Sequence, residues 1–368
     1  MQPCPADNRS FFVQLQKAEG LDLRDKRGKR HELAVVLTGV VLALLSQRDG
    51  CLSSLHRHLK NHYGRLMKAL ALEPQTAISR AQLPRVLEKV SVAVFDQLLF
   101  ANYGLQLRPQ ERQWFALDGK ELRGSIAPGA KRGEAVVQAI AHETRQTQSQ
   151  TYYAGDKESE VPAVRQLLHE QGLESEKVSL DALHCKPKTL APMAQAGGIY
   201  LVGLKENQPL MLAAVKAATA QRACLYHTAG VEKGHGRIEE REYQVYELAG
   251  LDQDERWAPC QISTAVKVRR ARLELKSGKA SEETSYYLSN QSTNYAELCV
   301  AVRNHWSVET NHHLRDVTLR EDQMRSKKRR PTACWQASGH WSRRSYRQPG
   351  VSIKKHNSKI LPIILIVC

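Results

Sequence analysis

Five short apolar segments in the middle of the chain constrain its fold more than any other feature. All have strand-like composition and lie at residues 114–119, 136–146, 149–155, 177–185 and 198–207. The first three follow one another with short connections, whereas the last two each come after a segment with helical spacing. Crossover helices connect parallel strands, which are buried on both faces and therefore almost continuously apolar. The sequence predicts a mixed α/β sheet.

A helical unit is predicted before this sheet and a β-rich insertion after it. Residues 1–110 have mainly three- and four-residue apolar spacing, and the apolar run 33–45 is too short for the ~20 residues that span a bilayer, so we expect a buried core helix. Within 208–290, segments 232–248, 262–275 and 284–290 each resemble a strand. The predicted organisation is a helical N-terminal domain at 1–110, which could bind DNA, the first part of the core at 111–207, the β-rich insertion at 208–290, a helix completing the core at 291–330 and an aberrant tail at 331–368.

The helix predicted within 291–330 carries an acidic residue on its apolar stripe. Asn294 followed by Glu297 is a helix-start signal, and Leu298, Val302 and Trp306 recur at helical spacing. Glu309 continues this stripe, so we expect a carboxylate directed towards the interior. The alternative is an amphipathic helix whose Glu309 lies at the rim and pairs with an arginine.

Three acids on predicted core elements are typical of a metal site. Asp118 ends one strand, Asp181 lies in a second, and Glu309 lies on the later helix. Mg²⁺ prefers carboxylate oxygens, and two ions can hold the attacking and leaving oxygens of a phosphodiester. An aspartate before a glycine is also a common turn residue, so each acid alone is a weak signal.

The charge of the chain favours an anionic partner. The formal net charge is +16 and the pI is about 9.5, which is typical of proteins that bind nucleic acid or an anionic membrane surface. The eight cysteines are scattered without a paired zinc spacing, as expected of reduced thiols. With no export signal in the sequence, we expect a cytoplasmic, nucleoid-associated protein without a membrane partner.

Six motifs resemble, in order and spacing, the insertion-sequence transposases of the H-repeat-associated (Rhs-linked) type. They are FALDGKELRGS at 115–125, VSLDALHCKPKT at 178–189, YLVGLKENQPLM at 200–211, EKGHGR at 232–237, YYLSN at 286–290 and RNHWSVETNHHLRDVTLREDQMR at 303–325. The resemblance implies a DDE enzyme with an RNase H-like core that cleaves DNA and transfers strands at element ends. It implies Mg²⁺ or Mn²⁺ bound by Asp118, Asp181 and Glu309.

The same resemblance suggests further roles and partners. It places the loop of Lys205 and Asn207 near DNA and gives His305, Trp306, His313 and Asp316 a role in supporting the Glu309 helix. The predicted DNA contacts are Lys120, Lys205, Asn207, His235, Arg237, Arg303 and His305. The expected partners are the terminal inverted repeats, the target DNA and further copies of the chain. Two alternatives are a metal-dependent nuclease without strand transfer and an inactive remnant that only binds DNA.

The end of the chain departs from the resemblance. From Pro331 onward there is no acidic residue and no clear helical period, and the chain ends in an apolar run. We hypothesise that this tail results from a frameshift, and that residues 360–367 are prone to aggregation.

Overall fold

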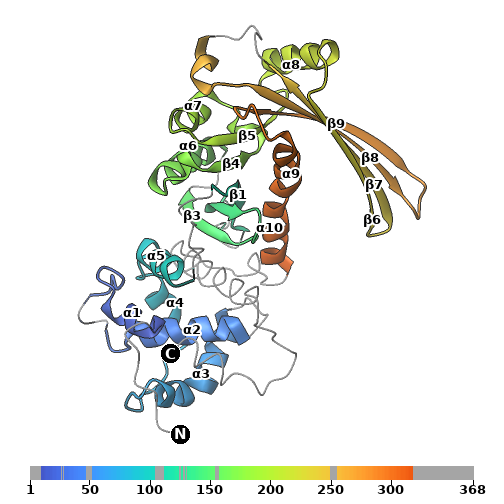
Figure 1. Ribbon diagram of the computed structural model, residues 1–368. Coiled ribbons are helices and arrows are strands. Elements are labelled where there is room, and N and C mark those ends of the chain that lie inside the picture. Colours follow the sequence, from blue (N-terminus) through green and yellow to red (C-terminus); the bar gives the residue numbers. More distant parts are fainter. Residues whose placement is uncertain are drawn as a thin grey trace. The chain divides into compact units, whose positions relative to one another are not determined.

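The computed structural model describes most of the chain up to Val317 (Figure 1). The described residues are 10–25, 27, 29–46, 52–103, 112–123, 126, 129, 131–153, 157–248 and 255–317. The predicted tail at 331–368 lies outside them. The chain divides into two compact units, one of which comprises Met1–Gln106, Lys120–Val136 and Asn311–Cys368, and the other Leu107–Gly119 and Val137–Thr310.

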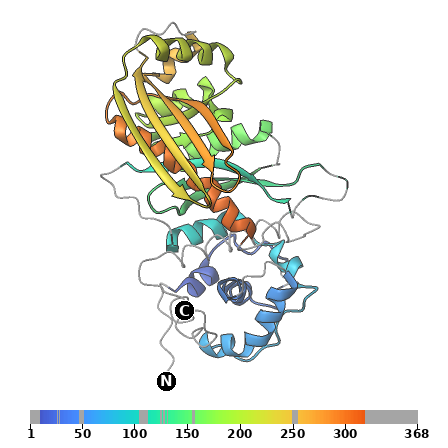
Figure 2. The same cartoon turned by 90° about the vertical axis from the view of Figure 1, so that its right-hand side faces the viewer.

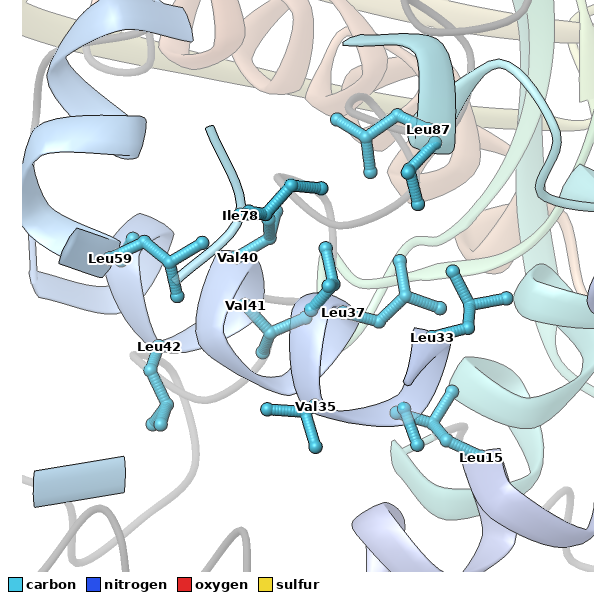
Figure 3. Packing of buried hydrophobic residues seen from close by; sticks show 14 of the residues in the cluster. Leu15, Leu33, Val35, Leu37, Val40, Val41, Leu42, Leu59, Ile78 and Leu87 are labelled. Carbon is cyan, nitrogen blue, oxygen red and sulfur yellow. The ribbon is translucent and has the colours of Figure 1, made fainter. Parts of the chain in front are cut away.

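The N-terminal helices pack around one apolar helix. They are α1 (Phe11–Lys17), α2 (Leu33–Ser46), α3 (Leu52–Ala69), α4 (Leu83–Leu87) and α5 (Val92–Tyr103). Helix α2 is apolar all round and is buried, as predicted; Figure 3 shows Leu37, Val40 and Val41 among side chains from its neighbours, including Leu59 and Ile78. Among the residues that the structure describes, no helix is long and apolar enough to cross a membrane.

One nine-stranded sheet dominates the second unit. Its strands are β1 (Trp114–Glu121), β2 (Ala135–Ala141), β3 (Thr147–Tyr153), β4 (Lys177–Leu180), β5 (Ile199–Leu204), β6 (Tyr226–Gly234), β7 (Arg237–Glu247), β8 (Thr264–Glu274) and β9 (Ala280–Ser289), in the order β3-β2-β1-β4-β5-β9-β8-β7-β6. All five strands predicted from apolar runs are present. The mixed α/β prediction is confirmed.

The first five strands form the RNase H-like core that the resemblance implies. Strands β1, β4 and β5 are parallel neighbours. The amide of His142 bonds to the carbonyl of Trp114 and that of Leu122 to Glu134, so β2 runs antiparallel to β1. The crossovers are made by α6 (Lys157–Glu170) after β3 and α7 (Pro187–Gln195) after β4. This connectivity brings the ends of β1 and β4 to the same edge of the sheet.

The strands of the insertion extend the core sheet. Strand β9 pairs antiparallel with β5, and β8, β7 and β6 follow, so these four strands form a ribbon that continues the core sheet. Figures 1 and 2 show that this ribbon is long and twisted. The segment 232–248, predicted as one strand, is a hairpin that turns at His235 and Gly236, both of which have positive φ. Strand β6 and helix α8 (Pro209–Gln221) were not predicted.

The helix predicted within 291–330 is divided in two. Helix α9 spans Tyr295–His305 and α10 spans Ser307–Val317, with Trp306 between them. Asn294 precedes the first turn as predicted, but it makes no side-chain cap and instead donates from Nδ2 to Glu297. Helix α9 packs on β4 and β5, and its Leu298 and Val302 join Leu201 and Val266 of the sheet in one apolar cluster.

Candidate active site

The two aspartates lie next to each other at the edge of the sheet. Leu117 of β1 is in register with Leu180 of β4, so Asp118 and Asp181 are neighbours. Asp118 lies within β1 and not at its end, and Asp181 is the first residue after β4 and not part of a strand, so both strand positions differ from the prediction. Side chains alternate along a strand, and Asp118 therefore projects on the same face as Ala116, and Asp181 on the same face as Ser179. This is the face that contacts the residues of α9 and α10, because Ser179 bonds to His305.

Packing of Val308 places Glu309 beside this edge. Val308 is 1% exposed and forms a small apolar cluster with Ala116 of β1 and Ile140 of β2. Since Ala116 lies two residues before Asp118 on the same face, this contact fixes the first turn of α10 near the strand-borne acids. Glu309 itself is exposed and, with Asp118 and Asp181, lines one cleft of about 780 Å³.

The prediction that Trp306 and Glu309 lie on the buried stripe is wrong. Trp306 is 40% exposed, and the stripe continues from Val302 through the half-buried His305 to Val308. Both progressions satisfy helical spacing, and only packing against the sheet distinguishes them. The ring of Trp306 instead lies against the guanidinium of Arg270, 5.0 Å from the ring centroid.

Burial and neighbouring carboxylates raise the pKa values of the two aspartates. Burial, followed by the nearby carboxylates of Asp181, Glu160 and Glu309, raises the pKa of Asp118 to about 8. Burial also raises the pKa of Asp181, with Glu160 adding to the shift and His184 and Lys205 opposing it. Burial is the larger cause for both aspartates, and the neighbouring carboxylates add to it.

Carboxylate oxygens on neighbouring strands suit a hard divalent ion in their chemistry. Burial and the neighbouring carboxylates disfavour the ionised form of Asp118, and a bound cation would favour it. Within the described residues, however, no three His, Cys, Asp or Glu side chains are grouped closely enough to hold a metal ion. The residues fit in donor type and charge, but they do not form a closed ligand set.

Seven of the ten predicted site residues line this one cleft. They are Asp118, Asp181, Lys205, Asn207, Arg303, His305 and Glu309. Asn207 donates from Nδ2 to the carbonyl of Ala182, so it ties its own loop to the turn that carries Asp181. His305 is held by Ser179 at 2.9 Å, and burial lowers its pKa to about 4, so the ring is neutral near pH 7.

The other three predicted residues lie elsewhere. Lys120 is buried and pairs with Asp316 of α10. His235 is in the exposed turn between β6 and β7, and Arg237 begins β7, where it pairs with Glu239. None of the three lines the cleft. Their contact with DNA stays a prediction.

Arg241 and two partners of the acids were not predicted from the sequence. Arg241 and Arg270 line the cleft, and both are paired with carboxylates of the ribbon, Glu239 and Glu283 among them. Glu160 of α6 and the buried His184 contact each other near the aspartates. The contact between them depends on the packing of α6. The sequence showed only that His184 follows Asp181 by three residues.

The fold is that of an RNase H-like α/β protein. Its cleft is lined by carboxylates and by the basic side chains of Lys205, Arg241, Arg270 and Arg303. Residues 109–335 match the family model described as Transposase DDE domain, and the chain belongs to this family. It is 25% identical over 318 residues to a protein of Escherichia coli (strain K12) named "H repeat-associated putative transposase YhhI", covering 82% of this chain and 81% of the relative. It is 24% identical over 322 residues to "Putative transposase YncI" of Escherichia coli O157:H7, covering 83% and 79%.

Proposed function

We propose that this chain cleaves DNA and transfers strands at the ends of an insertion sequence, with Asp118, Asp181 and Glu309 as the catalytic acids. The observation that carries the proposal is the convergence of these residues, from two neighbouring strands and one helix, on a single cleft. Membership of the transposase family supports the same reaction. The acids would hold Mg²⁺ or Mn²⁺, which supplies charge neutralisation at the phosphate and activation of the attacking oxygen.

The chain's own residues would bind and orient the DNA. Lys205, Arg241, Arg270 and Arg303 line the cleft and place positive charge beside the acids. Each of the three arginines pairs with an exposed carboxylate of the ribbon, Glu232 or Glu283, which DNA phosphates would displace, and Arg241 also pairs with the buried Glu239. The half-exposed ring of Trp306 offers a stacking surface for a base in the same cleft.

The reaction would be an in-line attack on phosphorus. A water molecule or a DNA 3′-hydroxyl is the nucleophile, and the leaving group is the 3′-oxygen of the cleaved strand. Packing of Val308 on Ala116 and the register of β1 with β4 bring the three acids to one cleft, where they would lie on the same side of the phosphate. Because two element ends must be held together for joining, the active form would contain more than one copy of the chain.

The test uses purified full-length protein, an oligonucleotide that carries the flanking inverted repeat, and Mg²⁺ or Mn²⁺. We expect nicked and strand-joined products, both lost in Asp118→Asn while DNA binding persists. Cleavage without joining would support the alternative of a metal-dependent nuclease. Binding without either product would support an inactive remnant, and full activity of Asp118→Asn would refute the assignment of the acids.

A further inference from the structure

Glu160 lies directly against the backbone that follows Asp118. A Cβ atom built at Gly119 would lie 2.6 Å from the Glu160 carboxyl carbon and 2.6 Å from the Tyr153 hydroxyl. The glycine after Asp118 is therefore needed for close approach, because any side chain there would displace this carboxylate. Tyr153 of β3 donates to Glu160 Oε2 at 3.0 Å, and the Glu160 side chain is only 14% exposed.

His184 connects Glu160 to Asp181. Its side chain is wholly buried, and Nε2 lies 3.3 Å from Glu160 Oε1 and 3.6 Å from Asp181 Oδ1. Carboxylate oxygens accept hydrogen bonds, so Nε2 carries the hydrogen and donates it to Glu160 Oε1, while Asp181 Oδ1 lies just beyond hydrogen-bond distance on the other side of the same nitrogen. The other ring nitrogen, Nδ1, is buried and has no hydrogen-bond partner in the described part of the chain. The two carboxylates are thus the groups that orient this ring.

Asp181 itself has few restraints. Its side chain is 45% exposed, and Oδ1 accepts a hydrogen bond from the amide of Leu183 at 2.9 Å. A half-exposed carboxylate with one local bond can rotate about its side-chain torsions unless a second group restrains it. The imidazole of His184 lies against it, and that ring is itself fixed by Glu160.

We propose that His184 is a positioning residue for the reaction, which holds the Asp181 carboxylate towards the cleft, and that Glu160 fixes the His184 ring in turn. This inference rests on the proposed function, because it assigns the role of Asp181 to binding a divalent ion. Groups that orient a metal-binding side chain change metal affinity or activity by about 10- to 100-fold when they are removed. Glu160 and His184 would act through Asp181 and not on the DNA.

The test compares substitutions that keep or lose the Nε2 donor. In His184→Gln the side-chain amide can reach the position of Nε2, whereas in His184→Asn it is one methylene too short. We expect His184→Asn to weaken Mn²⁺ binding, measured by calorimetry on the DNA-free protein, by about 10- to 100-fold, and to lower kcat for cleavage similarly with KM for DNA nearly unchanged. His184→Gln is expected to recover most of both. His169→Asn is the matched control, because that histidine is 80% exposed on the same helix as Glu160.

The outcomes separate this inference from the proposed function. Mn²⁺ affinity and kcat equal to those of the unmodified protein in His184→Asn would overturn it. Weaker Mn²⁺ binding in a protein whose unmodified form neither cuts nor joins DNA would support the positioning role and refute the proposed reaction. Should His184→Asn not fold, Glu160→Ala keeps His184 and removes its partner, and unchanged Mn²⁺ affinity in that variant would equally overturn the inference.

Discussion

Replacing Asp118 with asparagine should stabilise the metal-free protein at alkaline pH. The pKa of Asp118 is raised from 3.8 to about 8, so the folded protein holds a proton there that the unfolded chain releases. The stability contributed by this proton is fully present below pH 3.8 and is lost progressively as the pH rises to about 8. Asparagine is neutral throughout, so Asp118→Asn lacks this pH dependence.

The size of this difference in stability follows from the shift in the pKa of Asp118. At 1.36 kcal/mol for each pH unit, the difference between 3.8 and about 8 corresponds to an upper limit of about 6 kcal/mol above pH 8. Asp118 borders an open cleft, where water and side-chain movement reduce such costs, so we expect about 2–3 kcal/mol. Near pH 4 both side chains are neutral in the folded state, and the two proteins should be about equally stable.

Urea unfolding in EDTA at pH 4.5 and pH 9, followed by tryptophan fluorescence, measures this difference. The midpoint of Asp118→Asn should exceed that of the unmodified protein at pH 9 and approach it at pH 4.5. Added Mg²⁺ should raise the midpoint of the unmodified protein only, because the substitution removes a ligand. Equal midpoints at pH 9, or the same pH slope in both proteins, would refute the reasoning.

Three further substitutions test the packing of α10, the packing at the start of β5 and the basic side chains of the cleft. Val308→Ala removes two methyl groups that pack in the cluster with Ala116, and it should lower the free energy of unfolding by about 2 kcal/mol. The strand-transfer rate should fall, whereas the affinity for DNA, measured by filter binding, should stay the same. Gly198→Ala would place a Cβ atom 2.0 Å from the backbone oxygen of Glu174 and should lower the urea midpoint by the equivalent of about 2–4 kcal/mol. Arg270→Ala should weaken DNA binding and reduce the slope of log affinity against log salt by about one, whereas an unchanged slope would exclude a phosphate contact.

The core of the fold could be predicted because its strands are buried on both faces. Segments 114–117 and 199–204 are continuously apolar, and a strand can be predicted from such a run without knowledge of the rest of the molecule. The exposed ribbon was harder. Its polar alternation continues across His235 and Gly236, so two strands of a hairpin were predicted as one, and the turn depends on positive φ values that alternation does not reveal.

Some residues of the site could likewise be predicted from the sequence, whereas others depend on how the elements pack. Asp118 and Asp181 could be predicted as neighbours because each ends an apolar run, and parallel strands bring such ends to one edge. Glu160 gave no such signal, since it lies on a crossover helix among other charged residues. Its contact with Gly119 and His184 exists only because α6 packs against the sheet at that point.

Glu309 shows how a difference of one residue in a helical stripe changes the physical role of a side chain. The sequence allowed Val302, Trp306 and Glu309 as the buried progression, which would have required an acid inside the core. Val308 is buried in its place, and the next residue therefore turns by about 100° towards the cleft. An acid in that position keeps part of its hydration while its helix is held by an apolar neighbour. Val308 therefore anchors α10, and Glu309 supplies the acid. Val308→Ala should weaken the anchoring of α10 while the Glu309 carboxylate stays in the chain.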